Sequence, residues 1–129
     1  MINSSAFAYI NVLDKAADAS WLRNDAIANN IANVDTPGYK RQDVNFESQL
    51  QKALKNSRYE SVDDKVTNVN LKHLNPITYR DHSGFSYRLD GNNVDIDTEN
   101  VELASNQIRY QGLITSISQE FANLQAVMK

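Results

Sequence analysis

The stretch that decides the fold of this 129-residue chain is its C-terminal end, residues 98–129, which reads TENVELASNQIRYQGLITSISQEFANLQAVMK. Its apolar side chains recur at alternating spacings of four and three residues, the mark of a heptad seam along which one long helix packs against another. We therefore expect one long helix here, with this face buried. The seam positions, of which only Gln107 is polar, are Leu103, Gln107, Tyr110, Ile114, Ile117, Phe121, Leu124 and Met128.

The start of this helix carries its own signals. Asp97 is the expected N-cap, and Glu99 brings negative charge to the first turn, where the helix dipole favours it. Ile96 would then pack back on Val101 as a hydrophobic staple. Gly112 lies inside the helix at a cost of about 1 kcal/mol relative to alanine, either to permit a close helix approach or as a tolerated weakness.

A second, weaker seam occupies residues 4–33, where Ser4 or Ser5 would cap the helix start. Its smaller residues suit the larger ones of the C-terminal seam, as interdigitating layers require. Two long helices on so short a chain predict an elongated hairpin, or a subunit that buries its seams against neighbours. The plainer interpretation is that each seam is the core face of an amphipathic helix. The seam positions are Ala6, Ile10, Leu13, Ala17, Ser20, Asn24, Ile27 and Ile31.

Residues 34–97, between the helices, differ in kind, since they hold both prolines, both histidines and three of the four glycines. Short β-like runs occur at residues 63–71 and 84–89, and Phe46–Leu54 has a brief helical spacing. We expect this middle segment to be poorly ordered in the isolated subunit and to order on assembly. The chain as a whole is expected to be one mainly α-helical structural domain, with segments 1–33, 34–97 and 98–129.

Composition excludes several classes of function. The formal net charge of -3 argues against nucleic-acid binding, which needs a basic face. No run approaches the roughly 20 apolar residues of a membrane span, and the first residues lack the pattern of a cleaved signal peptide. There are no cysteines, which excludes disulfides, thiolate catalysis and most zinc sites. We expect neither a metal site nor any cofactor.

The most distinctive run is residues 28–41, ANNIANVDTPGYKR, which predicts a helix end followed by a tight turn. Thr36 is pushed to extended geometry by the proline that follows it. Pro37 and Gly38 then suit positions i+1 and i+2 of a type II turn. Asparagine is a poor helix former, yet four asparagines crowd the last turns. Their amides would either meet water at a frayed end or hydrogen-bond to a neighbouring subunit; they are Asn24, Asn29, Asn30 and Asn33.

This run resembles the N-terminal signature of the flagellar rod and hook family, an Asn-Ile-Ala-Asn core followed by Thr-Pro-Gly-Tyr. The chain is similar to the small proximal rod proteins because it lacks large inserted domains. Residues 92–97, NNVDID, resemble one proximal type, whereas the FlgC type usually has Pro-Asn-Val and a Glu-Met pair there. At this point of the sequence the present chain has Thr98-Glu99-Asn100 instead, without a Met there. The motif residues are Asn29, Asn30, Ile31, Ala32, Asn33, Thr36, Pro37, Gly38 and Tyr39.

The resemblance implies a structural subunit of the rod whose end helices pair antiparallel within a tube of like subunits. It also implies type III export without signal cleavage, and a location in the basal body outside the cytoplasmic membrane. The implied partners are the chain itself, FlgC-type rod subunits, the base adaptor FliE, the export apparatus and the membrane ring. The expected subunit-interface residues are Ile10, Leu13, Ala17, Ile27, Ile31, Tyr110, Ile114, Ile117, Phe121 and Leu124.

A candidate export signal begins at Phe46. Residues 46–50, FESQL, resemble a short export-gate signal of early flagellar substrates, a phenylalanine followed four residues later by an apolar residue, here Leu50. Ordinary packing of a helical Phe on its i+4 neighbour would give the same pattern.

Two other classes of function were weighed against the rod. The best catalytic candidates are His73, Asp81 and His82, but no nucleophile elbow or phosphate loop accompanies them, so we expect no enzyme. A soluble helical adaptor or chaperone would share both seams. It has no evident need for the Thr36–Tyr39 turn.

Overall fold

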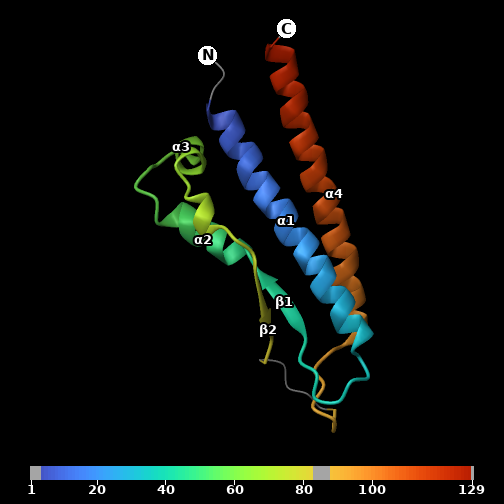
Figure 1. Cartoon of the computed structure of the whole chain (residues 1–129). Coiled ribbons are helices and arrows are strands. Elements are labelled where there is room, and N and C mark those ends of the chain that lie inside the picture. Colours follow the sequence, from blue (N-terminus) through green and yellow to red (C-terminus); the bar gives the residue numbers. More distant parts are fainter. Residues whose placement is uncertain (1–3, 83–87, 129) are drawn as a thin grey trace.

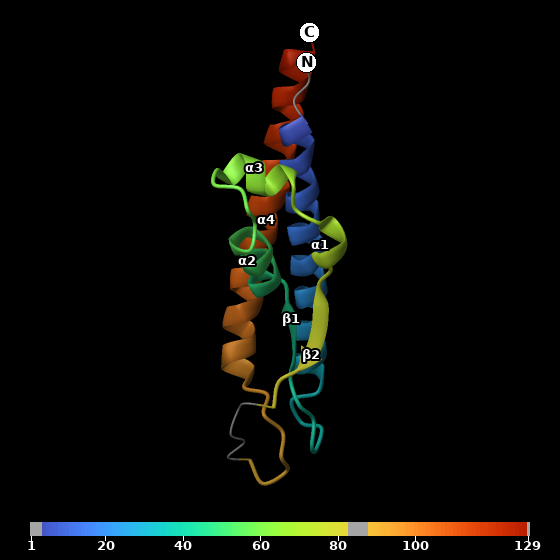
Figure 2. The same cartoon turned by 90° about the vertical axis from the view of Figure 1, so that its left-hand side faces the viewer.

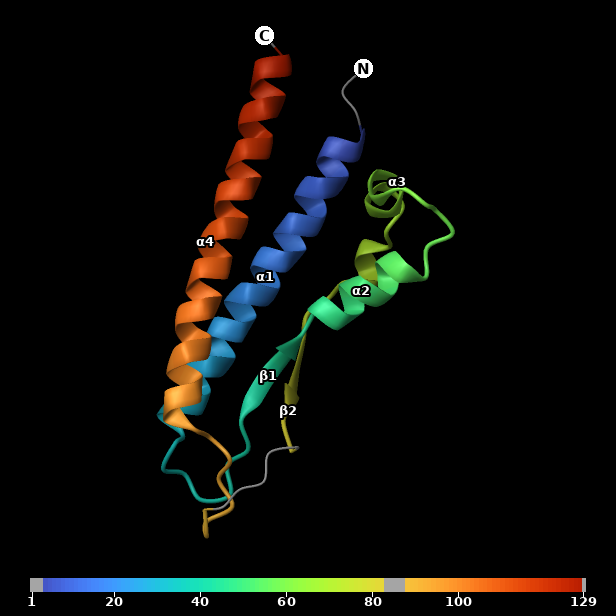
Figure 3. The same cartoon turned by 180° about the vertical axis from the view of Figure 1, so that it is seen from behind.

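Two long helices lying side by side dominate the computed structural model, which describes residues 4–82 and 88–128 (Figure 1). Helix α1 spans Ser4–Ala32 and helix α4 spans Ile96–Val127. They run antiparallel, so that the start of α1 lies near the end of α4 (Figure 3). The expectation of a mainly helical fold with paired terminal helices is confirmed.

The middle segment packs along α1 on the side away from α4 (Figures 1 and 2). Strands β1 and β2 form a two-stranded antiparallel sheet in which Gln42 pairs with Arg80 and Asn45 with Ile77. The elements of the segment, in order, are β1 Gln42–Asn45, α2 Glu47–Lys55, α3 Val62–Thr67, the 3₁₀ turn η1 Leu71–His73, and β2 Ile77–Arg80.

The helices of the middle segment test two of the expectations for it. The helical spacing that begins at Phe46 is confirmed by α2. The β-like interpretation of residues 63–71 is wrong, because α3 and η1 form there instead. Ser61 caps α3 by accepting a hydrogen bond from the Asp64 backbone N–H, at 3.1 Å, and local capping of this kind outweighs strand propensity. The β-like run at 84–89 lies almost wholly outside the described residues.

The hydrophobic core lies between α1 and the middle segment. Ala19 and Ala26 of α1 meet Val44, Phe46 and Leu74, and all five are nearly inaccessible to solvent. The alanines carry small side chains, so the strand and the turn after η1 approach the helix closely. Burial of the phenylalanine and the leucine therefore fixes the middle segment on α1.

The seam between the helices differs from the expected one on the α4 side. Every expected seam residue of α1 is buried or half-buried, and so are Leu103, Ile117 and Leu124 of α4. Gln107, Ile114, Phe121 and Met128, however, are exposed. The residues next to them replace them: Asn106 is buried, and Leu113 and Glu120 are half-buried. A polar asparagine in the seam hydrogen-bonds to a residue of α1. This contact orients α4 so that its most apolar stripe does not face α1.

The start of α4 is also corrected. Its N-cap is Asp95, not Asp97, and the Asp95 carboxylate accepts hydrogen bonds from the backbone N–H groups of Asp97 and Thr98. Ile96 is consequently inside the helix, and both it and Val101 are exposed, so no staple forms.

Gly112 permits no close helix approach. A Cβ built at this position would meet nothing within 4 Å. The glycine is therefore a tolerated weakness in the middle of α4.

Candidate assembly site

The family turn has the geometry that its sequence demands. The Tyr39 N–H donates to the Thr36 carbonyl at 3.3 Å, and Gly38 has a φ of 71°, as position i+2 of a type II turn requires. Asn33 closes α1 just before the turn. Its side-chain amide donates to the Asn29 carbonyl at 2.8 Å, and its side-chain oxygen accepts from the Thr36 hydroxyl at 3.1 Å.

A second turn, at residues 88–91, packs against the first. Gly91 has a φ of 76°, and its N–H donates to the Arg88 carbonyl at 3.1 Å. The Gly38 N–H donates to the Asp90 carbonyl at 2.7 Å, and the Lys40 ammonium donates to the Gly91 carbonyl. A Cβ on Gly91 would lie 3.8 Å from the Gly38 Cα. The two positive-φ glycines thus bring two distant parts of the chain into backbone contact.

Asn92, which follows the second turn, caps the end of α1 from across the fold. Its side chain is fully buried, and its amide group lies within hydrogen-bond distance of three carbonyl oxygens, those of Asn33, Val34 and Thr36, at 2.9–3.0 Å. Its side-chain oxygen accepts from the Val94 N–H at 2.8 Å. These carbonyls belong to the residues that follow α1, and buried carbonyl groups need such partners when water cannot reach them. Asn92 therefore joins the end of α1 to the lead-in of α4.

Asn30, also fully buried, joins α1 to its two neighbours. Its oxygen accepts from the Gln42 N–H at 2.7 Å and from the Tyr39 hydroxyl at 3.2 Å. Its amide donates to the Gln42 carbonyl at 2.8 Å and to the Glu99 carboxylate at 3.1 Å. The side chain thus makes four hydrogen bonds, its full capacity.

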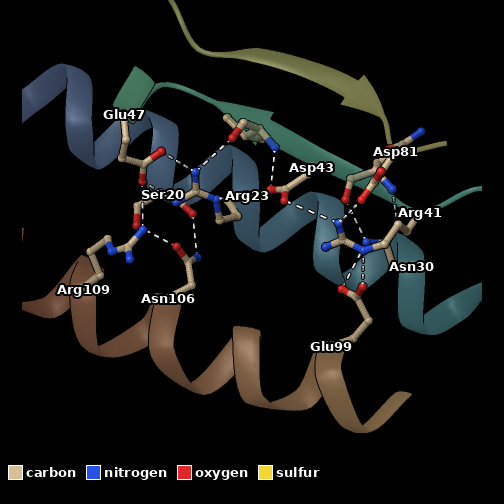
Figure 4. Close-up of polar contacts among 12 residues, drawn as sticks. Ser20, Arg23, Asn30, Arg41, Asp43, Glu47, Asp81, Glu99, Asn106 and Arg109 are labelled. Carbon is tan, nitrogen blue, oxygen red and sulfur yellow. Dashed lines mark hydrogen bonds and ion pairs between the residues drawn. The ribbon is translucent and has the colours of Figure 1, made fainter. Parts of the chain in front are cut away.

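The Glu99 carboxylate is buried in the first turn of α4 and is neutralised by Arg41. The Arg41 Nε lies 2.7 Å from Glu99, and its Nη1 lies 3.1 Å from Asp81 (Figure 4). Burial lowers the pKa of Arg41, but the hydrogen bond and charge of Glu99 outweigh it, so the pKa is raised overall. Arg41 is therefore charged at any physiological pH, and Asn30 donates a hydrogen bond to the second carboxylate oxygen of Glu99.

A second ionic cluster lies midway along α1. The Arg23 guanidinium donates to both carboxylate oxygens of Glu47 at 2.7 Å and to the Val44 carbonyl at 2.9 Å. Arg109 of α4 donates to the same carboxylate at 2.8 Å (Figure 4). The hydrogen bond from Arg23 lowers the pKa of Glu47 to about 2, against the opposing effect of burial. Glu47 thus connects α2 to both long helices.

A paired hydrogen bond fixes the register of the two long helices. The Ser20 hydroxyl donates to the Asn106 side-chain oxygen at 2.9 Å, and the Asn106 amide donates to the Ser20 carbonyl at 2.8 Å (Figure 4). Both side chains are buried. Sliding or rotating α4 would leave these polar groups unpaired, which is costly in a buried site.

The expected interface residues divide into two groups. Ile10, Ala17 and Ile27 are buried, and Leu13, Ile31, Ile117 and Leu124 are half-buried, all within this chain's own helix pair. The exposed ones are Tyr110, Ile114 and Phe121, all of α4.

Two asparagines of the family turn are used within the chain, which corrects both earlier interpretations for these two. Asn30 and Asn33 hydrogen-bond inside the fold, so they neither fray into water nor await a neighbour. Asn24 differs, because its buried side-chain oxygen has no hydrogen-bond partner among the described residues.

The other candidate residues lie apart from one another. Phe46 is buried in the core and Leu50 is half-buried, so the candidate export signal is covered in the folded chain. Asp81 is an ion-pair partner of Arg41, whereas His82 is exposed and His73 lies in η1. Within residues 4–82 and 88–128, no group of three His, Cys, Asp or Glu side chains could hold a metal, and no helix is long and apolar enough to cross a membrane.

Comparison with known proteins agrees with a structural subunit built from two paired helices. Residues 10–40 match the family described as flagella basal body rod protein. Over 92% of both chains, the sequence is 37% identical to the flagellar basal body rod protein FlgB of Bacillus subtilis. It is 36% identical to that of Borrelia hermsii over 93% of this chain, and 32% identical to that of Escherichia coli over 83%.

These identities place the chain in the class of flagellar rod structural proteins, which have no enzymatic role. Within that class, the chain belongs to the FlgB family. The NNVDID lead-in had indicated this type, and the helical adaptor is thereby set aside.

Sequence reasoning missed several residues of the site. Arg23 and Arg41 were not recognised as buried cations, and Glu99 was interpreted only as a favourable charge at the start of the helix dipole. Gly91 was not singled out, although Asp90-Gly91 is a strong turn signal. The charged residues carry no such local signal, because the partners at 2.7 Å, Glu47 for Arg23 and Glu99 for Arg41, lie 24 and 58 residues away in the sequence.

Proposed function

We propose that this chain builds the proximal part of the flagellar rod by packing its two long helices against those of neighbouring subunits. The observation that carries the proposal is the apolar stripe of α4 that the chain's own α1 leaves open. Ile114 and Phe121 are 42% and 51% exposed, although they continue a heptad seam. A seam of this kind is typical of helices that have a partner on that side.

The three segments act as one structural unit in this proposal. Asn30 links α1 to β1 and α4, and Glu47 links α2 to both long helices. The polar contacts hold the hairpin in one register, and the apolar stripe is left for assembly. A rigid subunit with an open seam suits a drive shaft, which must transmit torque.

The particular partners follow from family membership. We propose FlgC-type rod subunits as the next layer, the base adaptor FliE and the membrane ring at the base, and the export apparatus during delivery. The chain would be exported by the type III route and would function outside the cytoplasmic membrane. The candidate signal at Phe46 is covered in the folded chain, so it would be accessible to the export gate before folding.

Replacement of Phe121 by Asp tests the proposal. Because Phe121 is half exposed, Phe121→Asp should leave the helical hairpin folded while placing a charge on the open seam. We expect loss of swimming and of the subunit from isolated basal bodies, with unchanged circular dichroism. Ser105→Asp, at an exposed position on another face of α4, is the control and should swim normally. Normal incorporation of Phe121→Asp into basal bodies would contradict the proposal.

A further inference from the structure

One side of the helix pair is covered neither by the middle segment nor by any other described residue. We call it the open flank. Large apolar side chains are exposed along it, and between the helices there is a groove of about 360 Å³ lined by Trp21, Gln107 and Tyr110, among others. Trp21 is 65% exposed. The apolar members of the open flank are Phe7, Trp21, Tyr110, Ile114 and Phe121.

The spacing on the flank is that of a surface shaped for another helix. Phe7 and Trp21 are two heptads apart on α1, and Gln107, Ile114 and Phe121 follow one another at seven-residue intervals on α4. A seven-residue interval keeps side chains on one side of a helix over its whole length. The Asn24 side chain also lines the groove.

The α1 edge of the flank is acidic. Asp14, Asp18 and Asp25 lie one turn or two from Trp21 on the same side of the helix, and all three are exposed. None of them forms an ion pair with another described residue. The neighbouring Lys15 reaches the other way, to Asn75 of the middle segment. A partner on this side should therefore bring positive charge.

The surface of α2, which lies on the side of α1 away from α4 (Figure 1), carries unpaired charge of the opposite sign. Lys52 and Lys55 are exposed on α2, and Arg58 follows it; none of the three pairs with a described carboxylate. The same helix borders an open hollow of about 510 Å³ lined by Glu47, Ser48, Leu50, Gln51 and Leu54. A hollow with two leucines in its lining, on a helix with unpaired lysines, suits a protruding tryptophan with an acidic surround.

We infer that the open flank of one copy binds the α2 surface of a second copy, with Trp21 entering the hollow beside Leu54. The inference rests on the proposed rod function and names the contact between like subunits. The two surfaces lie on different sides of each chain, so the contact is heterologous. Heterologous contacts add subunits head to tail and generate rings or helical tubes rather than closed dimers.

Charge exchange tests the pairing of the two surfaces in cells that make no other copy of the subunit. Asp18→Lys with Asp25→Lys, or Lys52→Glu with Lys55→Glu, should each lower the amount of subunit in basal bodies about tenfold or more, because like charges would face each other. The four changes together should restore most of it. Glu60→Lys and Lys72→Glu, at exposed positions elsewhere, are matched controls and should have little effect.

Cross-linking tests the contact without relying on altered charge. The chain contains no cysteine, so Asp25→Cys and Lys55→Cys introduce the sole reactive thiols. A short bismaleimide applied to basal bodies of the double variant should give dimers and higher multiples of the chain. The Glu60→Cys, Lys72→Cys pair should give about tenfold less of these products.

The outcomes distinguish this inference from the rod function itself. Failure of the four-residue exchange to restore incorporation, or cross-linking of Asp25→Cys to a protein of another mass, would overturn the pairing of like subunits. The subunit would still be present in wild-type basal bodies in that case. Absence of the wild-type subunit from basal bodies would instead overturn the proposed function.

Discussion

Ser20 and Asn106 hydrogen-bond to each other twice across the interface of the two long helices, at 2.9 and 2.8 Å, although each belongs to a seam that is otherwise mostly apolar. A buried polar pair adds little net stability when it is satisfied, but it is costly to break. The pair therefore mainly fixes the register of the two long helices, as a buried polar residue does in coiled coils.

Asn106→Ala should destabilise the hairpin by about 1–3 kcal/mol, because the Ser20 hydroxyl loses its acceptor in a buried site. The double variant Ser20→Ala, Asn106→Leu should recover much of that loss but allow the helices to change register. Urea unfolding would measure the stability of each variant. Equal destabilisation by the single and double variants would contradict this role for the pair.

Arg41→Leu should be among the most destabilising changes in the chain. It leaves the fully buried Glu99 carboxylate without its cation, and breaking a buried pair from one side costs about 3–5 kcal/mol. Arg58→Leu, which removes an exposed arginine, is the control and should change the unfolding free energy little. Denaturant unfolding of the two variants side by side would check the difference. A loss in Arg41→Leu no larger than that of the control would show that water reaches Glu99.

Glu47 should make the stability of the chain fall in acid. Its pKa is lowered from the ordinary value of 4.5 to about 2 in the folded chain, chiefly by the hydrogen bond from Arg23. A carboxyl with a depressed folded pKa stabilises the fold above its unfolded pKa and loses that effect as pH falls. Stability should therefore decline between pH 4.5 and pH 2.

Glu47→Gln should flatten that decline, as measured by the free energy of unfolding at a series of pH values. The effect is moderated by solvent screening, because the Glu47 side chain is 56% exposed. Glu60→Gln, at an exposed position with no ion pair among the described residues, is the matched control. An identical acid limb in both variants would indicate that Arg23 does not hold Glu47 in solution.

The sequence predicted the helices well and their contact less well, for a physical reason. Periodicity and caps are local, so α1, α4 and the turn at Pro37 were accessible from the sequence. Which face of α4 is buried depends on the residues of α1 that it packs against. A single polar partner, Ser20, selects the stripe that contains Asn106 instead of the one that contains Gln107. The stripe through Gln107 is the more apolar of the two, so the sequence alone favours it, and the contact with Ser20 is not visible in the sequence.

The ion pairs and the strand β2 were missed for a related reason. Arg41 and Glu99 are 58 residues apart, and neither has a neighbour in sequence that marks it as buried. The pairing of β2 with β1 spans the whole middle segment, and the four residues of β2 are exposed. A strand without a buried face has no alternating pattern to recognise.

Gly38→Val should damage the family turn through the backbone alone. Gly38 has a φ of 71°, which a β-branched residue resists, whereas a Cβ at this position would meet nothing within 4 Å. The left-handed conformation costs ordinary residues about 1–2 kcal/mol, and asparagine tolerates it better. Gly38→Asn should therefore be more stable than Gly38→Val and should assemble into basal bodies in a larger amount. Gly112→Ala, inside α4, should leave the stability unchanged or raise it by up to about 1 kcal/mol. Thermal unfolding and the amount of subunit in basal bodies would rank the three variants. If Gly38→Val assembled as well as Gly38→Asn, the positive φ of the turn would have no part in placing Asp90 and Asn92 against the end of α1.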